Sequence, residues 1–149
     1  MDLKDCIRFA NDNKTCHLAT VEGDQPRVRA LGMWYADKTG FYFQGQTVKA
    51  FYNQLQKNPK VEIYFQAKDL SKVMRVSGKA KIITDNKIRA KCIEERPFVK
   101  NFGITTPDNP LLAVFQVYTG EAYFWTMADS MKEASLPRIK FGNNPDKAS

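Results

Sequence analysis

The sequence predicts an α+β protein, mainly β with flanking helices, whose strands form a largely antiparallel split barrel of about six or seven strands. Short stretches rich in β-branched and aromatic residues recur along the chain, and several alternate between apolar and polar positions. Short turn clusters join most neighbouring stretches, and such turns connect antiparallel strands. Three further stretches repeat apolar residues at helical spacing, so helices are expected over the openings of the barrel.

The first third of the chain predicts one helix followed by three strands. Asp2 caps a helix that ends near residues 11–13, because apolar residues recur there every three or four positions. A hairpin follows, with one strand over residues 15–21 and a second that starts at Pro26. After a turn, the aromatic residues 40–44 predict a third strand, which breaks at the Gln-Gly-Gln sequence that follows it.

The rest of the chain predicts two more helices and the remaining strands. A helix is expected to start at Thr47 and to stop before Pro59, which cannot continue it. Gly78 lies within a long β-branched stretch and indicates a bend that lets the sheet curl. The other expected elements are strands over residues 61–66 and 72–84, a helix from Asp85 to Pro97, and a last hairpin with strands over residues 111–118 and 120–127.

Composition indicates a single core with a less regular end. The 149 residues fit one domain, and a hydrophobic content of 43% is enough to build its core. We expect a barrel domain over residues 1–128 and a partly disordered C-terminal extension over residues 129–149, because regular patterns stop near Asp129 and the last eight residues are rich in Gly, Asn and Pro. The net charge of +7 favours an anionic partner.

The N-terminal residues and the cysteines indicate the cellular compartment of the protein. Acidic and basic residues are mixed through the N-terminus, and no apolar run reaches the roughly 18 residues of a membrane span, so neither a signal peptide nor a span is predicted. Cys6, Cys16 and Cys92 are an odd number without a close pair, which is typical of a reducing compartment. We therefore predict a cytoplasmic protein.

Residues 24–50 carry the pattern of a phosphate site. Arg27 and Arg29 are two positions apart on a strand and so share a face. Gly45 precedes the expected helix start at Thr47, with Lys49 in the first turn. Fixed positive charge and free backbone N–H groups at a helix N-terminus are what a phosphate needs. The stretch predicts a cofactor that carries a phosphate group.

The order of short motifs along the chain adds a family resemblance. These motifs are T-C-H-L-A-T-V, P-R-V-R-A-L, N-P-K-V-E-I-Y-F, V-S-G-K-A and G-E-A-Y-F-W. Over roughly residues 2 to 127 the chain resembles the pyridoxamine 5'-phosphate oxidase-like, FMN-binding split-barrel family. The resemblance implies a homodimer with FMN at the subunit interface, acting on a small-molecule substrate with a nicotinamide nucleotide as the source of electrons.

The resemblance also implies a set of cofactor contacts. Arg29, Thr47 and Lys49 match the positions that hold the FMN phosphate, and Arg27 is a further candidate on the same strand face. The remaining implied contacts are to the isoalloxazine ring: Phe43, Gln44 and Gly45 along its edge, Arg75 from the partner subunit, and Trp125 near the ring.

Two departures separate the chain from the authentic oxidase. Trp34 stands where that enzyme has a second basic residue. Met131 and Glu133 stand at the spacing of the Arg and His that hold its substrate. We therefore expect a different FMN-binding protein, an oxidoreductase that reduces a small electrophile with nicotinamide-derived electrons; a flavin store or a redox sensor is an alternative.

Other functions remain as alternatives. His17 is the single histidine, and no G-x-S-x-G turn is present, which excludes a Ser-His-Asp hydrolase. Members of the resembling fold that bind haem or deazaflavin form one alternative. A single-stranded nucleic-acid-binding barrel is another, because exposed aromatic rings and lysines can stack bases and follow a backbone. The basic residues gather at a helix start rather than along a groove, which favours the cofactor and makes nucleic acid the weaker hypothesis.

Overall fold

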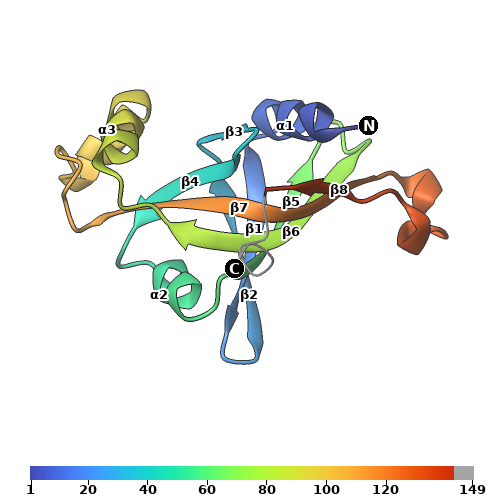
Figure 1. The fold of residues 1–149 in the computed structure, drawn as a ribbon, viewed down its shortest axis with the longest axis horizontal. Coiled ribbons are helices and arrows are strands. Elements are labelled where there is room, and N and C mark those ends of the chain that lie inside the picture. The colour runs from blue at the N-terminus through green and yellow to red at the C-terminus, as the bar shows by residue number, and fades with distance from the viewer. Residues whose placement is uncertain (143–149) are drawn as a thin grey trace.

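The computed structural model describes residues 1–142 and contains one eight-stranded sheet with helices around it (Figure 1). The strands are β1 (Thr15–Glu22), β2 (Gln25–Gly32), β3 (Tyr35–Asp37), β4 (Gly40–Gln46), β5 (Lys60–Gln66), β6 (Val73–Ile82), β7 (Leu112–Trp125) and β8 (Ile139–Phe141). The helices are α1 (Leu3–Asp12), α2 (Ala50–Lys57) and α3 (Asn86–Glu95), with short 3-10 helices η1 (Pro97–Phe102), η2 (Met127–Asp129) and η3 (Glu133–Ser135).

The sheet confirms the predicted antiparallel split barrel, with one strand more than the upper estimate. Its order is β2-β1-β5-β6-β7-β4-β3, and β8 also pairs with β7. Every pairing is antiparallel. Helix α1 packs against β3, β6 and β8, whereas α2 packs against β1 and β6, so the two helices cover different openings (Figure 1).

The predicted hairpin over residues 111–127 is wrong, because β7 is one continuous strand. The turn was expected between residues 118 and 120, but the strand continues through this point and Gly120 pairs directly with Gly78 on β6. A Cβ on Gly120 would lie 2.0 Å from the Ser77 carbonyl oxygen, and one on Gly78 would lie 2.2 Å from the Thr119 carbonyl oxygen. The glycines allow two backbones to approach where the strands bend, and the pairing register shifts between Lys79 and Ala80 as Gly78 had indicated.

The expected helix start at Thr47 is also wrong. Strand β4 does not break after Gln44 but continues to Gln46, which pairs with Leu112 of β7. The Thr47 hydroxyl then donates to the Pro110 carbonyl oxygen at 2.9 Å, and Lys49 is the N-cap of α2. Tertiary pairing with β7 therefore extends the strand and delays the helix to Ala50.

Two apolar clusters form the interior. The larger fills the space between the sheet, α1 and α2, and includes the stacked rings of Phe43 and Phe115, whose centroids are 5.0 Å apart. The smaller lies beneath α3 and η1 and contains Trp34, Cys92 and Val99, among others. This second cluster packs α3 against β4 and β7.

Part of the stretch beyond residue 128 joins the sheet. Strand β8 pairs with β7 over residues 120–122, and Phe141 is buried against Phe41. The predicted domain boundary at residue 128 stays a prediction, and residues 143–149 of the expected disordered tail lie outside the described residues. None of the helices within residues 1–142 is long and apolar enough to span a membrane; the cytoplasmic location stays a prediction.

Candidate functional site

A cavity of about 510 Å³ lies between β2, β4, the start of α2 and the connection from α3 to η1. Its volume is within the range of about 300–1,000 Å³ that is usual for small-molecule sites. It brings together four of the residues predicted from the sequence and adds one cation that was not predicted. These residues are Arg29, Gln44, Gly45 and Lys49, and then Arg96.

Arg29 is held at this cavity by a buried polar network. Its Nη1 donates to the Thr20 hydroxyl oxygen at 2.7 Å and to the Leu18 carbonyl oxygen at 3.2 Å, and its Nη2 donates to Gln54 Oε1 at 2.7 Å. The Thr20 hydroxyl in turn donates to Gln54 Oε1 at 2.6 Å, and both side chains are buried. The network fixes the guanidinium in place through neutral oxygens only.

Burial leaves the charge of Arg29 uncompensated. Desolvation lowers the pKa of its guanidinium from the ordinary value, yet arginine keeps its proton in proteins. Within residues 1–142 no carboxylate forms an ion pair with Arg29 or with Arg96. Among the described residues, no Asp or Glu lines the cavity either. Arg29 is half-buried, and the Glu22 carboxylate reaches its network only through Gln54, whose Nε2 donates to Glu22 Oε2 at 3.4 Å. An anion bound directly to the partly desolvated guanidinium would therefore be stabilising.

The N-terminus of α2 adds free hydrogen-bond donors. Asp2 caps α1 and Asp85 caps α3 through their side chains, but Lys49, the N-cap of α2, provides no such bond. The first turn of α2 also lacks an acidic residue. The Tyr52 N–H returns to the Lys49 carbonyl oxygen at 3.1 Å, so the N–H groups of Ala50 and Phe51 and the positive end of the dipole are what the helix offers an anion, next to the Lys49 ammonium group.

Two unpartnered polar atoms belong to residues of this cavity. Within residues 1–142, Gln44 Oε1 and Arg96 Nε are the buried side-chain polar atoms without a hydrogen bond. Buried polar atoms are paired in the large majority of cases. A ligand that donates a hydrogen bond to Gln44 and accepts one from Arg96 would satisfy both.

Gly45 sits against the wall of the cavity that Phe51 forms. A Cβ at Gly45 would lie 2.7 Å from Phe51 Cζ, which is closer than van der Waals contact allows. We expect Gly45→Ala to displace the Phe51 ring from its packing against Phe115 and to lower the free energy of unfolding by about 1–3 kcal/mol in urea denaturation.

Gly32→Ala is the matched control for Gly45→Ala. Its Cβ would lie 3.6 Å from Arg96 Nη2, an ordinary contact, and we expect a change below about 1 kcal/mol. Equal stability of Gly45→Ala and the wild type would contradict the predicted clash.

Five of the residues predicted from the sequence lie outside this cavity, and Phe43, Thr47 and Arg27 are three of them. Phe43 points into the core, because side chains alternate along β4 and its neighbour Gln44 takes the cavity side. Thr47 uses its hydroxyl on Pro110. Arg27 forms an exposed ion pair with Glu22 across the hairpin, at 2.9 Å. Their implied roles at a cofactor stay predictions.

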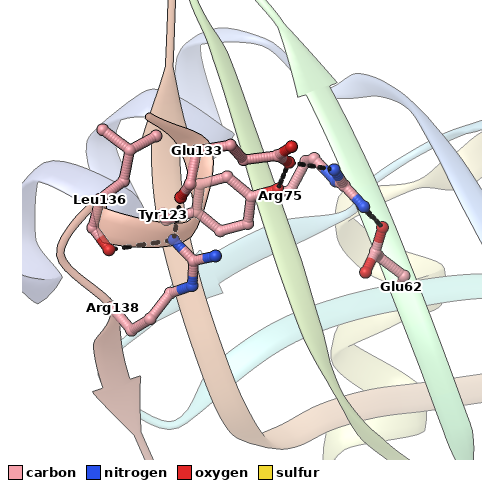
Figure 2. A network of polar contacts seen from close by, with 6 residues as sticks. All are labelled: Glu62, Arg75, Tyr123, Glu133, Leu136 and Arg138. Atoms are coloured by element: carbon pink, nitrogen blue, oxygen red, sulfur yellow. Dashed lines mark hydrogen bonds and ion pairs between the residues drawn. The ribbon is translucent and has the colours of Figure 1, made fainter. Parts of the chain in front are cut away.

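Arg75 and Trp125 line a different cavity, of about 310 Å³, with Tyr64 and Glu133. Figure 2 shows Arg75 between two carboxylates, Glu62 at 2.7 Å and Glu133 at 2.8 Å. The hydrogen bonds to Glu62 raise the pKa of Arg75. The positive charge of Arg75 is thus compensated within the chain, whereas the charges of Arg29 and Arg96 are not.

The sequence did not predict Arg96 as part of the site. It also did not predict Thr20 and Gln54, which hold Arg29. Arg96 follows α3, and its Nη1 donates to the Met33 carbonyl oxygen at 2.9 Å. Thr20 and Gln54 reach Arg29 from β1 and α2. No local motif marks any of these contacts, because each joins elements that are distant in the sequence. An arginine directly before Pro97, at the end of a predicted helix, was the one weak signal.

Fold and site together define a split-barrel protein with a cation-lined cavity beside β2 and β4. Residues 3–126 match the family model described as pyridoxamine 5'-phosphate oxidase. The chain belongs to this family.

Individual relatives agree with the fold. A pyridoxine/pyridoxamine 5'-phosphate oxidase from Rhodopseudomonas palustris (strain BisA53) is 37% identical over 76 residues, which are 50% of this chain and only 36% of the relative's length. A solved NimC/NimA family protein from Clostridium acetobutylicum has a TM-score of 0.76 at 25% identity, over 93% of this chain and 92% of that one. A pyridoxamine 5'-phosphate oxidase-related, FMN-binding protein from Nostoc punctiforme PCC 73102 has a TM-score of 0.62 at 13% identity, over 94% and 96% of the two chains, which shows a shared fold.

Proposed function

We propose that this protein binds FMN in the 510 Å³ cavity and works as an oxidoreductase that reduces a small electrophile. Family membership supports a flavin cofactor. The observation that carries the proposal is the convergence of two desolvated guanidinium groups, Lys49 and the uncapped start of α2 on one cavity without a carboxylate.

The residues of the cavity fit the chemical groups of FMN. Its phosphate suits Arg29, Lys49 and the first N–H groups of α2, where charge-assisted hydrogen bonds would form. The imide N–H of the ring suits Gln44 Oε1, the buried acceptor without a partner. Gly45 lines the cavity through its backbone, because the Phe51 ring occupies the space that a side chain at residue 45 would need. When bound, FMN supplies the two-electron chemistry, and the chain provides binding and orientation.

The lining of the cavity also limits what the chain does there. Within residues 1–142 the lining contains no Asp, Glu, His or Cys, and Lys49, the lining group that could transfer a proton, is assigned to the phosphate. Burial raises the pKa of Cys16 to about 12 and that of Cys92 to about 11, which keeps these thiols protonated and unreactive at neutral pH. We infer a reaction in which a nicotinamide nucleotide provides the electrons and the protein positions the reactants.

A homodimer is part of the proposal. Arg75 and Trp125 line a different cavity from Arg29 and Lys49, so both sets reach one flavin only if the second set comes from a partner subunit. The outer face of β2 supports this, because Val28 exposes 69% of its surface beside a hollow formed with His17 and Tyr64. Sedimentation should give twice the chain mass of 17.0 kDa. A monomer with bound FMN would contradict the dimer.

The absorption spectrum of the purified protein tests the proposed function. We expect the bands of oxidised flavin, either as isolated or after FMN is added and excess removed. A colourless protein that fails to take up FMN would refute the proposal. A Soret band would instead favour haem, and salt-sensitive retention of a single-stranded oligonucleotide would favour the nucleic-acid alternative.

A further inference from the structure

Arg96 is the cation of the cavity for which neither the sequence motifs nor the family match supplies a role. It is the C-cap of α3, and its N–H donates to the Cys92 carbonyl oxygen at 2.8 Å. Its Nη1 donates to the Met33 carbonyl oxygen, and the guanidinium carbon lies 5.0 Å from the centre of the Phe98 ring. The side chain is therefore anchored at both its backbone and its tip.

The Arg96 guanidinium keeps a hydrogen-bond donor that these contacts do not use. Arg96 Nε is buried and has no partner within residues 1–142. The carboxylate of the adjacent Glu95 makes no ion pair with Arg96 within residues 1–142. It accepts a hydrogen bond from the Trp34 indole N–H at 3.0 Å and pairs with Lys91. Arg96 thus presents a desolvated positive charge to the cavity with no protein anion to balance it.

Arg96 and Arg29 lie at opposite ends of the cavity. The Arg29 guanidinium points to Thr20, which pairs with Arg27, so it reaches toward the hairpin. Arg96 Nη2 lies 3.6 Å from the point where a Cβ on Gly32 would stand. Gly32 is three residues further along β2 than Arg29, so their backbones are about 10 Å apart at the usual rise per residue, and strand alternation directs positions 29 and 32 to opposite faces of β2. One phosphate group at the Arg29 end would not span that distance.

We propose that Arg96 binds the pyrimidine edge of the flavin ring, while Arg29 and Lys49 hold the phosphate at the other end. The inference rests on the proposed function. A guanidinium suits the carbonyl oxygen of that edge and stabilises negative charge on the ring, so Arg96 both binds the cofactor and raises its reduction potential. Trp34 is buried and donates to Glu95, so the cation at this end of the cavity comes from α3 instead of from residue 34.

Fluorescence titrations of the full chain with FMN and with riboflavin test this assignment. Riboflavin has the ring but no phosphate. We expect Arg96→Gln to weaken both ligands by a similar factor, on the order of tenfold, and to lower the reduction potential of bound FMN. The exposed Lys100→Gln on η1, which removes the same charge four residues away, should leave both affinities unchanged.

The outcomes separate this inference from the proposed function. If the wild type binds FMN but Arg96→Gln binds both ligands as tightly, or loses affinity for FMN alone, the ring-edge assignment is overturned while the function stands. A wild type that binds no flavin overturns both. If Arg96→Gln does not fold, Arg96→Lys decides: it keeps the charge without the planar fork and should weaken both ligands severalfold in parallel. Unchanged binding by Arg96→Lys would then count against the proposal.

Discussion

Replacing Arg29 by alanine should lower the affinity for FMN by roughly 10- to 100-fold while the barrel stays folded. A hydrogen bond to a charged group contributes about 1.5–3 kcal/mol, and each 1.4 kcal/mol is a factor of about ten in affinity. The fold should tolerate the change, because Thr20 and Gln54 keep the hydrogen bond that joins them. Titration of the apoprotein with FMN gives the affinity, and circular dichroism checks the fold.

Arg27→Ala is the matched comparison for Arg29→Ala. It removes the same charge from the same strand face two residues away, but Arg27 lies outside the cavity and is paired with Glu22. We expect a loss of less than about threefold, since exposed ion pairs contribute little. A larger loss for Arg27→Ala than for Arg29→Ala would reverse the assignment of the phosphate end.

The largest effect on stability is expected at Phe43. Its side chain is fully buried and stacks on Phe115 with an angle of 8° between the ring planes. Phe43→Ala should lower the free energy of unfolding of the apoprotein by about 3–5 kcal/mol, because it leaves a cavity in a close-packed core. Urea denaturation followed by fluorescence measures this loss.

Two further results decide the role of Phe43. Phe98→Ala removes a ring that is 44% exposed and should cost clearly less stability than Phe43→Ala. If Phe43→Ala instead leaves stability within about 1 kcal/mol of the wild type and abolishes FMN binding, Phe43 contacts the cofactor, as the family resemblance implies, and its placement in the core is wrong.

Local rules were enough to predict most of the elements. The alternation of residues 61–66 gave β5 within one residue, and the caps Asp2 and Asp85 gave the starts of α1 and α3. These features depend on side-chain period and on hydrogen bonds to the nearest turn, so the sequence alone contains them.

The errors arose where distant segments decide the local structure. Gly120 has the appearance of a turn residue, but its partner Gly78 lies 42 positions earlier, and only their pairing shows that β7 continues. The start of α2 was misplaced because β7 holds the end of β4 in the sheet. Propensity gives no information on such pairings.

In the candidate site, too, local patterns predicted some residues, whereas others depend on tertiary packing. Arg29, Gln44, Gly45 and Lys49 meet at one cavity because strand alternation and the β4–α2 connection bring them together. Arg27 shares a strand face with Arg29, but its guanidinium forms an ion pair with Glu22 across the hairpin. Arg96 could not be predicted, because its place beside β2 depends on how α3 packs.

Comparison of the affinities for FMN and riboflavin in the wild-type protein tests the central claim most directly. The two ligands differ by the phosphate alone, so their ratio measures what the cations and helix start at the Arg29 end contribute. We predict that FMN binds at least about tenfold more tightly and that this advantage is clearly smaller in Arg29→Ala, where Lys49 and the start of α2 remain. Equal affinity for the two ligands, or binding of neither, would contradict the assignment of this cavity as an FMN site.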